Sequence, residues 1–305
     1  MASAWRCLVT NLRYTVCPGP AGPAGLSVLT VEATSPPPYL LDGGEGNQKP
    51  VLHLLGAQIR FPPTVLHVHD GLLETVTIRE EKDRLVLAFS LAHPTLLAVS
   101  RAAGLPALLR VEMSREPLYR IMRGRRILID PAHGGKETGG RGPVDLQEKD
   151  KVLALALLLR RELEELGATV YLTREGDDGP SLGERRALAY GLRPEAVVLL
   201  HLGRFPAAER GGFRTAWATD PGRPLAVAIH RSLAKTLPLP DRGMGMGPPL
   251  GMAWVPAAIA ECATITNPVE EGWLRSGTFL RRAARAIANG FKDYFARRAS
   301  TPALF

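Results

Sequence analysis

Strand-like and helix-like segments alternate from residue 126 onward, and this alternation is the strongest constraint on the fold. Four short apolar runs predict strands, at 126–130, 168–174, 195–203 and 253–262. Between and after them, helical patterns lie at 148–167, 181–192, 225–237 and about 272–298. Crossover helices of this kind connect parallel strands and cover both faces of their sheet. We therefore predict an α/β fold with a mostly parallel twisted sheet for residues 127–298.

The first 115 residues carry a different pattern. Residues 75–78 alternate in polarity, 80–83 form a polar turn and 84–89 are apolar, which together indicate a β-hairpin. Further strand-like runs lie at 26–33, 51–61 and 107–114. We predict a small all-β, sandwich-like domain at 1–115 and a basic linker at 116–126.

The net charge of +8 is concentrated in residues 116–305, which hold 28 basic and 21 acidic side chains. A basic domain favours anionic partners such as nucleic acid, an anionic membrane or an anionic wall polymer, although an arginine-rich composition alone also produces it. Nucleic-acid binding would use the arginine cluster of the last predicted helix, Arg281, Arg282 and Arg285. The chemistry-bearing residues lie elsewhere, so we expect no nucleic-acid partner.

Export signals and cysteine pairs give little further guidance. No run of 18 or more apolar residues exists, so we expect no transmembrane segment, and the N-terminal MASAWRCLVTNLRYTVC lacks the apolar core of a signal peptide.

The three cysteines, Cys7, Cys17 and Cys262, are too few for a disulfide framework and lack metal-binding spacing. A bridge between Cys7 and Cys17 is one alternative, and free thiols are the favoured one.

Chemistry-bearing side chains gather at the predicted strand ends. Ligands of open α/β sheets bind beyond the carboxyl ends of the strands. The residues found there, or at the start of the first predicted helix, are Asp130, His133, Glu148, Arg174, His201 and Glu261. Two histidines and a carboxylate can hold a zinc ion and leave a position for water, and a further carboxylate can act as general base. The glycines of HGGKETGG would leave room for a ligand.

Each signal alone has a plainer interpretation. A strand-end histidine is more often structural, and Glu148 at a helix start is favourable against the helix dipole. Glu261 is harder to dismiss, because it follows the apolar run PAAIA, where an unpaired carboxylate is costly. His67 and His69 share a strand face and could bind metal, but without further local ligands a plain strand is favoured. Cys262 is a nucleophile in principle, and a buried small residue is the favoured alternative.

In combination these segments resemble a known family. IDPAHGGKETGGRGPVDLQEKD, with 14 residues between His133 and Glu148, is followed by GATVYLTR, VVLLHLGR, DRGMGM and IAECATITNPVEEGWL. This order is similar to that of the zinc-dependent N-acetylmuramoyl-L-alanine amidases, the amidase-3 family, over about residues 125–296. The all-β region weakly resembles the AMIN-type β-sandwich, which often precedes such domains and binds the cell wall.

The resemblance implies His133, Glu148 and His201 as zinc ligands and Glu261 as the catalytic carboxylate. It implies hydrolysis of the amide between N-acetylmuramic acid and L-alanine in peptidoglycan, outside the cytoplasm, with any activating protein partner unidentified. Asp130 would orient a ligand histidine. Arg242 would contact a substrate carboxylate or, equally well, form a surface ion pair.

Several positions depart from the family pattern and put substrate positioning in doubt. They are Ala132, Glu137, Leu199, Leu200, Gly203 and the Cys-Ala-Thr that follows Glu261. Only 59 residues separate His201 from Glu261, which leaves little room for an inserted inhibitory helix, so we expect an open site. Two alternatives stay open: a zinc enzyme for another amide or peptide, and a catalytically impaired amidase-like protein that acts as a wall-binding or regulatory module.

Overall fold

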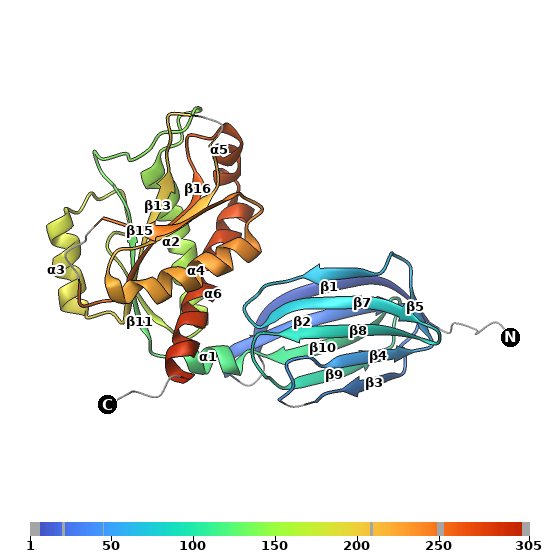
Figure 1. Ribbon diagram of the computed structural model, residues 1–305. Coiled ribbons are helices and arrows are strands. Elements are labelled where there is room, and N and C mark those ends of the chain that lie inside the picture. Colours follow the sequence, from blue (N-terminus) through green and yellow to red (C-terminus); the bar gives the residue numbers. More distant parts are fainter. Residues whose placement is uncertain (1–6, 20–21, 45, 208–209, 249–252, 301–305) are drawn as a thin grey trace. The chain divides into compact units, whose positions relative to one another are not determined.

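A computed structural model describes residues 7–19, 22–44, 46–207, 210–248 and 253–300. The chain divides into two compact units, residues 1–120 and 121–305 (Figure 1). The order of an all-β region and a mixed α/β region confirms the predicted fold class. Helix α1 (Glu116–Met122) lies within the range 116–126 that we expected to be a linker.

Two five-stranded sheets build the β unit. One contains, in spatial order, β5 (Ala57–Ile59), β1 (Cys7–Gly19), β2 (Gly22–Ala33), β10 (Ala107–Ser114) and β9 (Leu97–Ala102). The other contains β3 (Tyr39–Asp42), β4 (Val51–Leu55), β8 (Arg84–Leu91), β7 (Leu73–Glu81) and β6 (Thr64–His67). All neighbours are antiparallel except β1 and β5. Alternate residues of β4 and β10 are buried, as expected of strands with one core face.

A buried ion pair lies inside the β unit. The side chain of Asp70 is 1% exposed, and its Oδ2 accepts hydrogen bonds from Arg115 at 2.7 Å, from Ser27 at 2.5 Å and from the Tyr14 hydroxyl. Burial alone would raise the pKa of Asp70, but the charge of Arg115 and these hydrogen bonds lower it below its ordinary value.

Cys7 and Cys17 are both free and lie ten positions apart on the single strand β1. An extended strand places them about 33 Å apart, far beyond the reach of a disulfide. The alternative of a bridge between them is therefore wrong.

The α/β unit contains one six-stranded sheet. Its spatial order is β12 (Thr169–Leu172), β11 (Arg126–Pro131), β13 (Ala196–Gly203), β16 (Ala257–Thr264), β14 (Phe213–Trp217) and β15 (Asp241–Met246). Among the strands of the described residues, only the β14–β16 pair of this sheet is antiparallel. Strands β14 and β15 were not predicted from the sequence, whereas the other four were.

Helices cover both faces of this sheet (Figure 1). On one face α6 (Gly277–Ser300) packs against α2 (Glu148–Glu165) and α4 (Arg223–Thr236), which in turn contact the strands. On the other, Ala189 of α3 (Leu182–Leu192) packs with Leu128 and Val197. The short helix α5 (Pro268–Leu274) follows β16. Of the helices in the described ranges, none is long and apolar enough to cross a membrane.

Candidate metal centre and active site

His133 lies just beyond the end of β11 in a left-handed backbone conformation, with φ of 62°. Buried Arg174 holds this turn by donating to the carbonyls of Pro131 and Ala132, each at 2.9 Å. Arg185 Nη2 donates to the carbonyl of His133 at 2.8 Å. Arg174, which the sequence places at a strand end, therefore supports the backbone that carries the histidine.

Glu148 opens helix α2 and is 2% exposed. Its Oε2 lies 3.3 Å from His133 Nε2, and its Oε1 lies 3.3 Å from His201 Nδ1. The backbone amides of Gly140 and Leu202 donate to the same carboxylate at 2.7 and 2.9 Å. Burial alone would raise the pKa of Glu148, but the bonds from the histidines and amides outweigh burial and hold the pKa far below its ordinary value.

The glycine-rich loop comes close to these side chains. A Cβ on Gly139, where φ is 69°, would lie 2.5 Å from His133 Cδ2 and 2.8 Å from Glu148 Oε2. A Cβ on Gly134 would lie 1.9 Å from the carbonyl oxygen of Asp178. Gly139 therefore allows the loop to pack directly against the histidine and the glutamate, and Gly134 allows it to pack against the backbone of Asp178.

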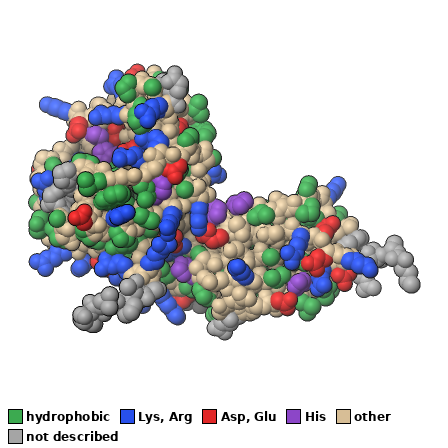
Figure 2. All heavy atoms as spheres, viewed as in Figure 1, with side chains coloured by type: hydrophobic (Ala, Val, Ile, Leu, Met, Phe, Trp, Pro, Cys, Tyr) green, Lys and Arg blue, Asp and Glu red, His purple; other side chains and the backbone are tan. Residues whose placement is uncertain are grey.

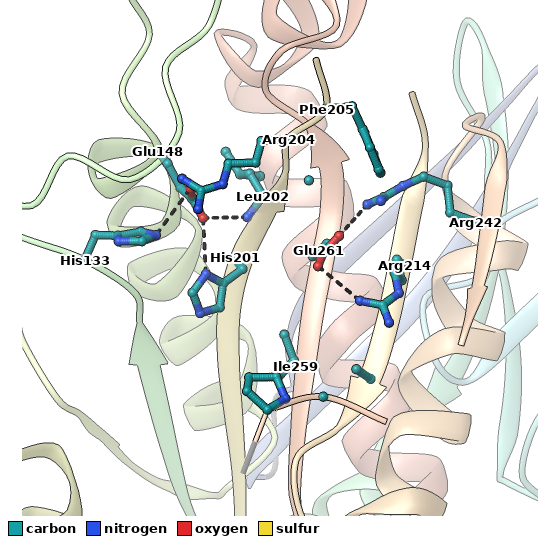
Figure 3. A pocket seen from close by; sticks show the side chains of 14 residues that line it. His133, Glu148, His201, Leu202, Arg204, Phe205, Arg214, Arg242, Ile259 and Glu261 are labelled. Atoms are coloured by element: carbon teal, nitrogen blue, oxygen red, sulfur yellow. Dashed lines mark hydrogen bonds and ion pairs between the residues drawn. The ribbon is translucent and has the colours of Figure 1, made fainter. Parts of the chain in front are cut away.

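His201 and Glu261 are lateral neighbours on the adjacent parallel strands β13 and β16. Across the pocket from the histidines, the Glu261 carboxylate faces two arginines (Figure 3). Arg242 Nη2 lies 2.5 Å from Glu261 Oε2, and Arg214 Nη1 lies 3.6 Å from Glu261 Oε1. Arg242 also donates from Nε to the carbonyl of Gly212 at 3.0 Å and stacks over the ring of Phe205.

These residues line one pocket of about 410 Å³. It is bounded by His133, Glu148, His201, Leu202, Gly203, Arg204, Phe205, Arg214, Ala216, Arg242, Gly247, Pro248, Ile259 and Glu261. Figure 2 shows histidine side chains beside basic ones on one face of the α/β unit. The structure thus brings His133, Glu148, His201, Glu261 and Arg242 into a single cavity.

Asp130 lies beneath the site and contacts no histidine ring among the described hydrogen bonds. Its Oδ1 accepts from Thr173 at 2.5 Å and from Arg185, the residue that also holds the His133 carbonyl. Glu137 instead approaches the ring, with Oε1 2.9 Å from His133 Nδ1. Within the described ranges Asp130 therefore makes no direct hydrogen bond to a ligand ring, and its link to His133 runs through Arg185 to the backbone.

Among the described residues, the alternative candidates His67, His69 and Cys262 do not belong to the metal cluster. His67 ends β6, and His69 Nδ1 lies 3.2 Å from Glu74. Within the described ranges, only His133, Glu148 and His201 form a cluster suited to a metal ion. Cys262 is fully buried, and burial raises the pKa of its thiol to about 12, which is unsuited to a nucleophile.

Sequence reasoning missed eight of the pocket residues, among them the three with charged or aromatic side chains, Arg204, Phe205 and Arg214. Arg214 lies on the unpredicted strand β14, and the other two directly follow β13. The buried Glu271 of α5 was also missed: it accepts from the amides of Val144 and Leu146 at 2.9 and 3.1 Å and so fixes the loop before Glu148. The signal for Glu271 was the acidic pair in NPVEEGWL, because carboxylates in the first turn of a helix are favoured by its dipole.

A family profile described as N-acetylmuramoyl-L-alanine amidase matches residues 127–293, more than half of the chain. The chain belongs to this amidase family. The match contains all the pocket residues described above.

Two curated relatives of this chain are probable cell wall amidases called LytH. The protein of Staphylococcus saprophyticus is 28% identical over 197 residues, covering 63% of this chain and 66% of the relative. That of Staphylococcus aureus is 30% identical over 178 residues, covering 57% of this chain and 60% of the relative. The chain thus spans less than two thirds of the length of these relatives.

Two solved structures share the fold of the α/β unit. The catalytic domain of the N-acetylmuramoyl-L-alanine amidase CwlV from Bacillus (Paenibacillus) polymyxa var. colistinus matches with a TM-score of 0.54 at 28% identity, over 56% of this chain and 98% of that domain. The N-acetylmuramoyl-L-alanine amidase of Clostridium difficile 630 matches with a TM-score of 0.55 at 26% identity, over 57% and 98%.

Proposed function

We propose that this chain is a zinc-dependent amidase that hydrolyses the bond between the lactyl group of N-acetylmuramic acid and L-alanine in peptidoglycan. The observation that carries the proposal is the pocket in which His133, Glu148 and His201 face Glu261. Membership of the amidase family and the likeness to cell wall amidases support the reaction class and an extracytoplasmic place of action.

The donor set fits a zinc ion. The three candidate ligand atoms lie within 4.8 Å of one another. Zinc bonds of about 2.1 Å in tetrahedral geometry place ligand atoms about 3.4 Å apart, close to the 3.3 Å between Glu148 and each histidine. Glu137 occupies His133 Nδ1, which leaves Nε2 to face the cluster, an arrangement common for metal-bound histidines.

Each protein group then has a defined task. Zinc held by His133, Glu148 and His201 would polarise the amide carbonyl and lower the pKa of a water molecule. Glu261 would accept the proton of the attacking water and deliver it to the leaving nitrogen of L-alanine. Arg242 would be a positioning residue, because its short contact with Glu261 fixes the carboxylate at the pocket wall.

We further propose that the α/β domain, 127–298, carries the chemistry and that the β domain, 1–115, is an AMIN-like module for wall binding. The two parts then divide catalysis and attachment. Deletion of residues 1–115 should reduce co-sedimentation with purified sacculi and spare hydrolysis of small soluble muramoyl peptides. Unchanged co-sedimentation would contradict the binding role.

The decisive experiment measures stem-peptide release from purified sacculi with the zinc-loaded full chain, with and without a chelator. We expect release that stops on chelation and returns with zinc. Glu261→Gln should lower the rate by at least about 100-fold, as expected for loss of a general acid–base, while retaining zinc. Bound zinc without amide cleavage, and no effect of Glu261→Gln, would refute the amidase proposal.

One observation favours a second candidate, an impaired amidase that acts as a wall-binding or regulatory protein. Both carboxylate oxygens of Glu261 face arginines, so the base is engaged within the protein. This candidate predicts zinc binding and sacculus binding without peptide release.

A further inference from the structure

The pocket contains more positive than negative charge. Among the residues that the structure describes, three arginines, Arg204, Arg214 and Arg242, line it with only two carboxylates, Glu148 and Glu261. With neutral histidines the net charge of these groups is +1, and a divalent cation would add two more positive charges. An open cavity with this charge favours a ligand that carries an anionic group.

Arg242 is already engaged and does not offer its charge to a ligand. Its side chain is 13% exposed, its Nη2 contacts Glu261, and its Nε donates to the carbonyl of Gly212. The excess positive charge therefore resides on the other two arginines.

Arg214 lies directly beside the reactive carboxylate but is weakly bound to it. It pairs in register with Glu261 across the antiparallel β14–β16 pair. The 3.6 Å between Arg214 Nη1 and Glu261 Oε1 exceeds a hydrogen-bond distance, and its side chain is 35% exposed. Gly245 of β15 lies beside the guanidinium, and a Cβ at this position would lie 3.1 Å from Arg214 Nη2. Because the residue is a glycine, no side chain covers the guanidinium there. The Arg214 guanidinium therefore has N–H donors to offer to the pocket (Figure 3).

Arg204 stands at the metal-ligand side of the pocket. Arg204 and Glu148 lie on either side of Gly140. A Cβ on Gly140 would lie 3.8 Å from Arg204 Cβ and 3.2 Å from Glu148 Oε2. Arg204 is exposed, and no hydrogen bond or ion pair joins its side chain to another residue in the described ranges. The segment is nonetheless fixed, because the next amide, that of Phe205, donates to Thr266 Oγ1 at 3.0 Å.

We propose that Arg204 and Arg214 form an anion subsite for a carboxylate on the peptide side of the scissile amide. The inference rests on the proposed amidase function. The carboxyl group of the muramoyl unit is consumed in the scissile amide, and its other groups are neutral hydroxyls and an acetamide. A carboxylate in the substrate therefore belongs to the peptide, and guanidinium groups match carboxylate geometry.

The test compares two synthetic substrates in which the side-chain carboxyl of the glutamate is blocked as a methylamide. One is N-acetylmuramoyl-L-alanyl-D-glutamate γ-methylamide, whose α-carboxylate is free, and the other is its isoglutamine counterpart, whose α-carboxyl is a carboxamide. We expect the zinc-loaded full chain to prefer the free carboxylate by about tenfold or more in kcat/KM, the size expected for a hydrogen bond to a charged group. Arg204→Gln and Arg214→Gln should each reduce this preference, mainly through KM for the acid. Arg231→Gln, an exposed arginine of α4 outside the pocket, is the matched control and should keep the preference.

The outcomes separate the subsite from the reaction. Equal kcat/KM for acid and carboxamide, with normal turnover of both, overturns the subsite and leaves the amidase function standing. If the protein cleaves neither substrate, that result counts against the amidase function. Calorimetry with the same two peptides then decides whether the subsite exists. A tighter dissociation constant for the acid that is lost in Arg204→Gln supports the subsite, and equal constants overturn it.

Discussion

The guanidinium of Arg242 occupies the space that a side chain at Gly203 would need. A Cβ on Gly203 would lie 2.5 Å from Arg242 Nη2 and 2.8 Å from Thr264 Oγ1. Gly203 is one of the positions at which this sequence departs from its family, two residues after His201. The departure is therefore linked to the contact between Arg242 and Glu261.

Gly203→Ala should push Arg242 away from Glu261, because the new methyl group and the guanidinium cannot share one space. We expect kcat for a muramoyl peptide to fall by about tenfold, with unchanged zinc content. The matched control is Gly191→Ala in α3, where a Cβ meets nothing within 4 Å. Gly191→Ala should leave kcat unchanged and should be neutral or stabilise helix α3 by up to about 1 kcal/mol. A normal kcat in Gly203→Ala would show that Arg242 does not position Glu261.

Gly139→Ala should weaken zinc binding, because its Cβ would crowd both His133 and Glu148. The measurement is a zinc titration against a competing chelator. Gly124→Ala is the control, since Gly124 has a similar φ of 73° with nothing within 4 Å of its Cβ position. Both variants carry backbone strain of about 1 kcal/mol or more, so equal zinc affinities in the two would exclude the crowding effect.

Zinc affinity should fall steadily as the pH is lowered from 8 to 5. The hydrogen bond with Glu148 raises the pKa of His133 above its ordinary value of about 6.5. An imidazole must lose its proton to bind a metal, so a raised pKa lets protons compete with zinc at a higher pH. Glu148→Gln removes this partner and a candidate ligand together, and we expect it to abolish tight zinc binding. A zinc affinity that does not change over this pH range would contradict the assignment of His133.

Asp70→Asn should destabilise the β unit by about 3–5 kcal/mol, because it leaves Arg115 buried without its charge partner. The folded-state pKa of Asp70 is lowered. Its contribution to stability is therefore fully present above the unfolded-state pKa of about 3.9 and is lost as the pH falls below that value. Hydrogen exchange of β2 and β10 amides measures the effect. Asp83→Asn, with a side chain 74% exposed, is the control and should cost less than about 1 kcal/mol.

The α/β alternation was readable from the sequence because strands buried on both faces give apolar runs, and amphipathic helices separate them. Strands β14 and β15 were not predicted, because FRTAW is short and DRGMGM contains two glycines. Strand β1 was not predicted, because its polar residues interrupt the alternation. Its pairing with β2, which the sequence pattern does not show, stabilises it.

The candidate ligands could be predicted because parallel strands end at one edge of the sheet, where His133, His201 and Glu261 meet. Arg214 could not, since it enters from the antiparallel strand β14, and the sequence does not reveal strand direction. The contact between Glu137 and the His133 ring could not be predicted either, because it accompanies a left-handed turn at His133 that the sequence pattern did not reveal.

His201 and Glu261 are paired on adjacent strands, so the spacing of the strands sets the distance between the candidate metal site and the candidate base. Neighbouring strands lie about 4.8 Å apart in any sheet, and a one-residue slip would turn Glu261 to the opposite face. Loops, by contrast, can change in length and sequence without altering that spacing. Evolution can therefore reshape the pocket rim around Arg204 and Phe205, and with it the choice of substrate, while the reacting groups keep their separation.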